Sequence, residues 1–132
     1  MTMGRLAGHL AEIPMWGVMT LTRDEVDLGQ TGGGAPPAPY EMKTRAEMLA
    51  KFDDVTTKTR AALAAATDEV MMQPWTLKNN GKAVMTLPRV AVMRSFVMNH
   101  MVHHRAQLGV YLRMNEVAVP SIYGPSADEG AM

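Results

Sequence analysis

The longest helical pattern in the sequence, from Pro88 to about Asn115, most restricts how this chain can fold. Proline is tolerated in the first turn of a helix, so Pro88 is a suitable start. About 26 helical residues extend over about 39 Å. The positions predicted to be buried recur at a helical spacing and are Met93, Val97, His100, His104, Leu108 and Tyr111. A helix of this length needs other helices to cover its apolar face, which favours an all-α fold.

Two further segments carry the same kind of pattern. Residues 2–22 place Leu6, Leu10, Ile13 and Gly17 on a single helical face. The other segment begins at Thr44, because Thr44 and Glu47 have the spacing of a capping box, and it should end before Pro74. We therefore predict an up-down helical bundle with three main helices.

The connecting segments are rich in turn-forming residues. Residues of about 24–43 contain three consecutive glycines and several prolines, so we predict a long loop there. Asn80-Gly81 is typical of a tight turn and indicates a short hairpin before the last helix. Residues 117–132 are predicted to form an extended tail. All of these parts fit one domain over residues 1–132.

The composition excludes several classes of protein. The 132 residues include no cysteine, which excludes a disulfide scaffold, a thiolate metal site and a cysteine nucleophile. The apolar runs are far shorter than the roughly 20 residues that span a bilayer. No basic and aromatic pattern points to nucleic acid. We therefore expect a cytoplasmic protein with neither a membrane nor a nucleic acid as its partner.

The histidines are the candidate chemical groups. His100 and His104 are four residues apart, so on a helix they point in nearly the same direction. A single histidine on an apolar helix face is more often a hydrogen-bonded core residue than a ligand. Two adjacent buried imidazoles both need partners, and one metal ion supplies both. His9 on the first helix completes a triad, whereas His103 lies about 100° from His104 and should face away or sit at the edge.

A site of three imidazoles favours particular chemistry. Three neutral ligands and an open position are typical of catalytic rather than structural metal sites. Residues 70–115 contain six Lys/Arg and no Asp or Glu, which favours an anionic fourth ligand such as hydroxide or a thiolate. Exposed arginines on an amphipathic helix explain the same charges. Arg105, beside the site, fits an anionic substrate or a surface ion pair equally well.

Three segments resemble one known family. Residues 100–113, the tail from Val119 to Glu129 and the segment Leu6–Glu12 are similar to motifs of the DinB-like (damage-inducible, YfiT-related) family. The resemblance implies a four-helix bundle that binds one divalent metal ion through His9, His100 and His104. It also implies a homodimer, and characterised relatives include thiol transferases.

The chain departs from that pattern in one respect. The first helix of the family is missing here, because the sequence begins almost at the His9 motif. Three helices enclose a core less completely than four. We therefore expect either a truncated start or a partner subunit that covers a large apolar surface near the first helix.

Two functional hypotheses follow. The first is a metal-dependent enzyme, of thiol-transferase or hydrolase type, in which Zn, Ni or a similar divalent ion activates a thiol or water. Its partner would be a small-molecule thiol or electrophile. The alternative is a non-catalytic metal-binding module that acts as a dimer in a stress response or an interaction.

Overall fold

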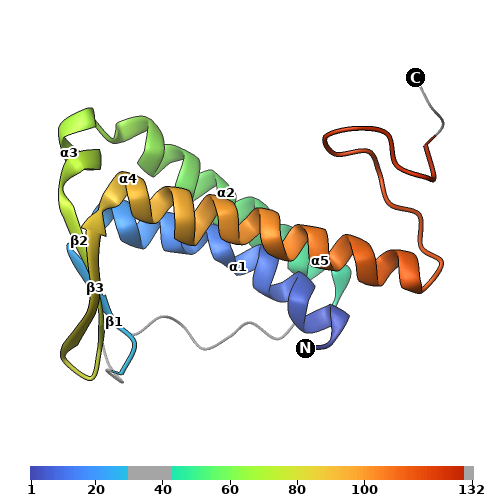
Figure 1. Cartoon of the computed structure of the whole chain (residues 1–132), viewed down its shortest axis with the longest axis horizontal. Helices are drawn as coiled ribbons and strands as arrows, with labels where there is room; N and C mark the ends of the chain where they lie inside the picture. Colours follow the sequence, from blue (N-terminus) through green and yellow to red (C-terminus); the bar gives the residue numbers. More distant parts are fainter. Residues whose placement is uncertain (30–42, 130–132) are drawn as a thin grey trace.

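The computed structural model describes residues 1–29 and 43–129, and it contains helices and a small sheet (Figure 1). The elements are, in order, α1 (Met3–Thr22), β1 (Glu25–Asp27), α2 (Arg45–Ala65), α3 (Asp68–Met72), β2 (Pro74–Asn79), β3 (Lys82–Pro88), α4 (Arg89–Val92), the π-helical segment η1 (Met93–Asn99) and α5 (His100–Met114). The elements α4, η1 and α5 follow one another without a break and form one rod. The prediction of an all-α up-down bundle is therefore wrong, because strands are present.

Threonine side chains begin three of the helices. Thr2 accepts a hydrogen bond from the Arg5 N–H at the start of α1, and Thr44 accepts one from the Glu47 N–H at the start of α2. Thr67 does the same for α3. The predicted single helix from Thr44 to before Pro74 is therefore wrong, because the backbone is extended at Ala66 and a new helix is capped at Thr67.

The sheet has three strands in the order β1-β2-β3. β2 and β3 pair antiparallel, and their turn contains Asn80 at φ 50° and Gly81 at φ 77°. Positive φ at both residues is typical of a tight hairpin turn and explains the Asn-Gly pair. The predicted hairpin is thus confirmed. β1 pairs parallel to β2 and lies inside the segment predicted to be a loop, so that prediction is wrong for residues 25–27. The rest of that predicted loop, residues 30–42, lies outside the described residues.

Helix α1 packs against both α2 and the rod. Gly17 permits the close approach, because a Cβ atom there would lie 2.8 Å from the Thr59 Cγ2 atom and 3.2 Å from the Met93 Cε atom. One apolar cluster joins α1 to the sheet around the fully buried Trp75. A second cluster joins α1 to the rod through Ile13, Met93 and Val97. Within the described residues, no helix combines the length and apolar character needed to cross a bilayer.

The stripe predicted on the last helix is only partly buried. Met93 and Val97 are buried, whereas His100, His104 and Leu108 are half-buried and Tyr111 is exposed. α5 has no fully buried residue. The core therefore lies towards the sheet end of the rod, and the histidines lie where burial decreases.

Candidate metal centre

Three histidines from two elements meet at the contact between α1 and α5. The Nε2 atom of His100 lies 3.3 Å from Nε2 of His9 and 2.8 Å from Nε2 of His104. One ring nitrogen from each residue can be chosen so that all three lie within 4.8 Å of one another. All three rings are half-buried. The structure thus brings together the three residues that the sequence singled out.

Two of the three rings are oriented by hydrogen bonds at their other nitrogen. His100 Nδ1 lies 3.3 Å from the Phe96 carbonyl oxygen, which can only accept, so Nδ1 carries the proton. His104 Nδ1 donates to Gln107 Oε1 at 2.7 Å. In the neutral rings these bonds leave the Nε2 lone pairs of both residues directed into the cluster. Histidines that bind metals usually have such a partner, which fixes the tautomer.

The π-helical segment η1 ends immediately before His100 and contributes to this arrangement. The His100 backbone N–H donates to the Val97 carbonyl, and the His100 side chain uses the Phe96 carbonyl. Short π-helical turns are frequent at functional sites. The sequence pattern did not indicate this segment, the Phe96 carbonyl or Gln107. Gln107 lies three residues after His104, a spacing that allows contact on a helix, and this was the one available signal.

The lowered pKa values favour neutral imidazoles, which is the form of histidine that binds a metal ion. Burial lowers the pKa of His9, and positive charge on His100, His104 or Arg5 would lower it further. Burial and the neighbouring His104 likewise lower the pKa of His100. Two neutral rings with Nε2 atoms 2.8 Å apart direct lone pairs at each other, which is unfavourable unless a cation lies between them. The donor set therefore fits a divalent transition metal ion.

His103 and Arg105 occupy the margin of this cluster. The His103 side chain is exposed, and its ring packs edge-on against His104 with 4.9 Å between centroids. It does not belong to the three-histidine group. The Arg105 guanidinium lies over the ring of Tyr123, 5.0 Å from its centroid, and Arg105 also lines an apolar cavity with Leu10 and Phe52.

A separate cavity of about 330 Å³ reaches the cluster at His100. Among the described residues, its lining consists of Ser95, Phe96, Asn99, His100 and His103 and includes no acidic side chain. The surface of this lining is mostly apolar, and the opening is a route by which a small molecule could approach the cluster.

The metal-free protein should lose stability on acidification. The lowered pKa values of His9 and His100 mean that the unfolded chain takes up protons near pH 6.5 while the folded chain does not. The free energy of unfolding should therefore fall as the pH decreases from about 6.5 and level off below the lowered pKa values. Urea unfolding between pH 5 and 8 measures this slope. Replacing both His9 and His100 with glutamine should flatten it, and an unchanged slope would contradict the assignment.

One of three comparisons with known proteins gives a match. Comparison with curated proteins and comparison with solved structures give no significant match. The family model described as DinB family matches residues 1–131, which is nearly the whole chain. This match agrees with the resemblance of the His9 and His100–Arg113 segments, and it shows that the chain belongs to the DinB family.

Proposed function

We propose that the protein is a divalent-metal-dependent enzyme that activates a thiol or a water molecule. The observation that supports it best is the convergence of three imidazole Nε2 atoms, two of them with the opposite nitrogen already hydrogen-bonded. In this proposal His9, His100 and His104 hold one Zn, Ni or similar ion. Such an ion on neutral ligands keeps its full charge and lowers the pKa of a bound thiol or water.

The chain itself contributes position, charge and access. Phe96 and Gln107 hold two of the rings in a ligating orientation. Arg5, whose positive charge lowers the pKa of His9, favours an anionic nucleophile over a neutral one. The cavity at His100 admits a second, electrophilic reactant. Thiol transfer and hydrolysis both fit, and the cytoplasm supplies reduced small-molecule thiols for the former.

A metal-binding module that acts as a homodimer is the alternative. It is favoured by apolar side chains that α5 leaves exposed, including Val110, Tyr111 and Met114. Exposed apolar surface of this kind is typical of protein interfaces. In this alternative the histidines and their metal would stabilise the fold rather than perform chemistry.

Turnover by metal-loaded protein separates the two functions. Pairs of small thiols and electrophiles, together with a panel of esters and amides, are the substrates to assay. The enzyme hypothesis expects turnover with at least one of them, abolished by His9→Ala and retained by the control Val84→Ala, which changes an exposed residue of β3 outside the cluster and its cavity. Circular dichroism checks that each variant folds. Absence of turnover across both panels would favour the module. Turnover that His9→Ala leaves intact would contradict the role of the histidine cluster in the reaction.

A further inference from the structure

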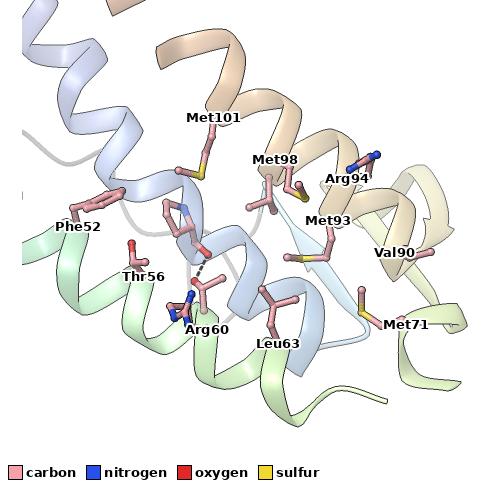
Figure 2. A pocket seen from close by; sticks show the side chains of 13 residues that line it. Phe52, Thr56, Arg60, Leu63, Met71, Val90, Met93, Arg94, Met98 and Met101 are labelled. Carbon is pink, nitrogen blue, oxygen red and sulfur yellow. Dashed lines mark hydrogen bonds between the residues drawn. The ribbon is translucent and has the colours of Figure 1, made fainter. Parts of the chain in front are cut away.

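An apolar groove lies between α2 and the rod, and none of the three clustered histidines lines it. It consists of two cavities of about 560 and 430 Å³, which share Phe52, Met98 and Met101 and therefore form one trough. Figure 2 shows the side chains that line the larger of the two. Leu63 from α2 and Met93 from the rod line it further. Methionine side chains are flexible and pack against partners of different shape, so a groove lined by several methionines can bind the surface of another protein segment.

The rims of this groove remain exposed. Leu63 and Val90 are exposed on opposite rims, and the Met98 side chain is 51% exposed. Of the helix α2, only Val55 and Thr59 are buried. Monomeric proteins rarely leave a contiguous apolar surface of this kind uncovered. We therefore expect a segment with an apolar face to bind in the groove.

The charges around the groove specify that occupant further. Among the residues that the structure describes, the charged side chains that line it are Arg60, Arg94 and Arg105, and no acidic residue does so. Within residues 1–29 and 43–129, neither Arg60 nor Arg94 has an ion-pair or hydrogen-bond partner. The occupant should thus carry negative charge beside its apolar face.

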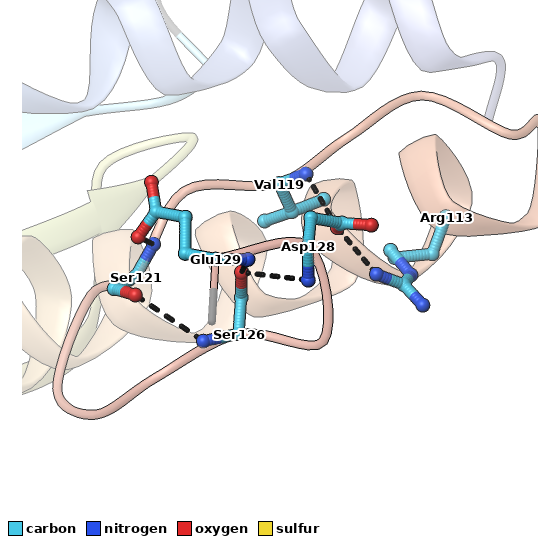
Figure 3. Close-up of polar contacts among 6 residues, drawn as sticks. All are labelled: Arg113, Val119, Ser121, Ser126, Asp128 and Glu129. Atoms are coloured by element: carbon cyan, nitrogen blue, oxygen red, sulfur yellow. Dashed lines mark hydrogen bonds and ion pairs between the residues drawn. The ribbon is translucent and has the colours of Figure 1, made fainter. Parts of the chain in front are cut away.

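The segment of residues 117–129, which we term the C-terminal hook, has this character. Its backbone is organised by its own side chains (Figure 3). Asp128 accepts hydrogen bonds from the Val119 N–H and from Arg113, and Glu129 accepts one from the Ser121 N–H. Ser126 donates its N–H to Ser121 Oγ, which closes a loop with residues 122–125 at its tip. A segment ordered in advance loses little entropy on binding.

The tip of the hook is apolar and uncovered. Ile122 is exposed, and Tyr123 is 84% exposed even though Arg105 lies against its ring. Tyrosine is one of the residues that most often anchor protein interfaces. The hook contains two acidic and no basic residues, so its charge is opposite in sign to that of the groove arginines. Asp128 also pairs with Arg113 of its own chain, so Glu129 is the carboxylate that is less engaged.

We propose that the C-terminal hook of one copy docks into the apolar groove of a second copy. Ile122 and Tyr123 contact Met98 and Met101, while the hook carboxylates face Arg60 and Arg94. The hook does not fill the groove of its own chain, because Tyr123 remains largely exposed beside Arg105. Reciprocal docking produces a closed twofold dimer. The metal site takes no part, so this dimer stands or falls independently of the proposed reaction.

Sedimentation equilibrium of the full chain, with a chelator present, tests the dimer. Ile122→Ala/Tyr123→Ala and Arg60→Glu/Arg94→Glu should each weaken dimerisation by roughly 30-fold or more, the effect of losing interface anchors. The matched controls are Val84→Ala, an exposed apolar residue on β3, and Arg45→Glu on α2. Circular dichroism and thermal unfolding verify that all variants fold. A monomeric wild-type protein, or equal effects from the controls, would overturn the proposal.

Mixing the two variants tests the specific pairing. Ile122→Ala/Tyr123→Ala alters the hook and keeps the groove, whereas Arg60→Glu/Arg94→Glu alters the groove and keeps the hook. A mixed dimer therefore retains one intact pair of hook and groove, and mixing the variants should restore dimerisation in part. The chain has no cysteine, so introduced thiols can be cross-linked selectively. A bis-maleimide should join Tyr123→Cys in one copy to Met98→Cys in another, but not to Val84→Cys. Failure of the mixture to dimerise would contradict docking between copies. Absence of a cross-link between a Tyr123→Cys chain and a separate Met98→Cys chain would contradict it as well.

Discussion

Replacing His100 with alanine is expected to weaken Zn²⁺ binding by more than about 100-fold. His100 is central, because its Nε2 atom lies within 3.3 Å of the Nε2 atoms of both other histidines. Loss of a residue that only orients a ligand already costs about 10- to 100-fold in affinity, so loss of a ligand should cost more. Competition with a chromophoric chelator measures the dissociation constant.

Two further variants allow the loss of Zn²⁺ affinity in His100→Ala to be compared with smaller expected losses. Gln107→Leu removes the acceptor for His104 Nδ1 and should weaken binding by about 10- to 100-fold. His103→Ala, the matched control on the same helix, should leave affinity unchanged, because His103 lies outside the three-nitrogen group. If His103→Ala bound Zn²⁺ more weakly than Gln107→Leu does, the ion would lie elsewhere.

The thermal stability of the same variants supplies a second measurement. A ligand at about 100 times its dissociation constant stabilises the folded state by about 2.7 kcal/mol. Wild-type protein should therefore gain thermal stability on addition of Zn²⁺, and His100→Ala should not. Without metal, the thermal stability of His100→Ala should be similar to that of the wild-type protein, because the substitution also removes the opposed lone pairs of His100 and His104. Equal metal-induced stabilisation of both proteins would contradict the site.

The helices were predictable from the sequence because their apolar residues recur on one face. The limits of α1 and the start of the rod at Pro88 agree closely with the prediction. The strand β1 was not predictable, because three residues are too few to show alternation and its pairing with β2 joins distant parts of the chain. The break at Ala66 was missed because a single threonine cap competes with a continuous helical pattern.

The candidate site was predictable to the level of residue identity. The spacing of His100 and His104 places both on one helix face, and His9 was the remaining histidine. The partners of these rings were not predictable, because the Phe96 carbonyl becomes an acceptor through the backbone of η1 rather than through any side chain. The alignment of Arg60, Arg94 and Arg105 along one groove was also not predictable, because these residues come from different parts of the chain.

Substitution of Arg89 by methionine is expected to destabilise the protein by about 2–4 kcal/mol. The Arg89 side chain is only 4% exposed and connects the rod to the end of α1. Its guanidinium donates to the carbonyls of Thr20 and Arg23 at 2.5 and 2.7 Å, and to Asp24 at 2.6 Å. Methionine fills similar space but leaves the buried Thr20 carbonyl and the partly buried Arg23 carbonyl without their donor. Urea unfolding at pH 7 measures the loss.

The effect should come from the carbonyls rather than from the ion pair. The Asp24 side chain is 91% exposed, so water can replace the guanidinium at that carboxylate. An exposed ion pair contributes about 0–1 kcal/mol, and Asp24→Asn should therefore cost no more than that. Arg45→Met, which removes an exposed arginine from α2, should change stability by less than about 0.5 kcal/mol. If Asp24→Asn were as destabilising as Arg89→Met, the ion pair would be the main contribution of Arg89 to stability. The hydrogen bonds to the Thr20 and Arg23 carbonyls would then contribute little.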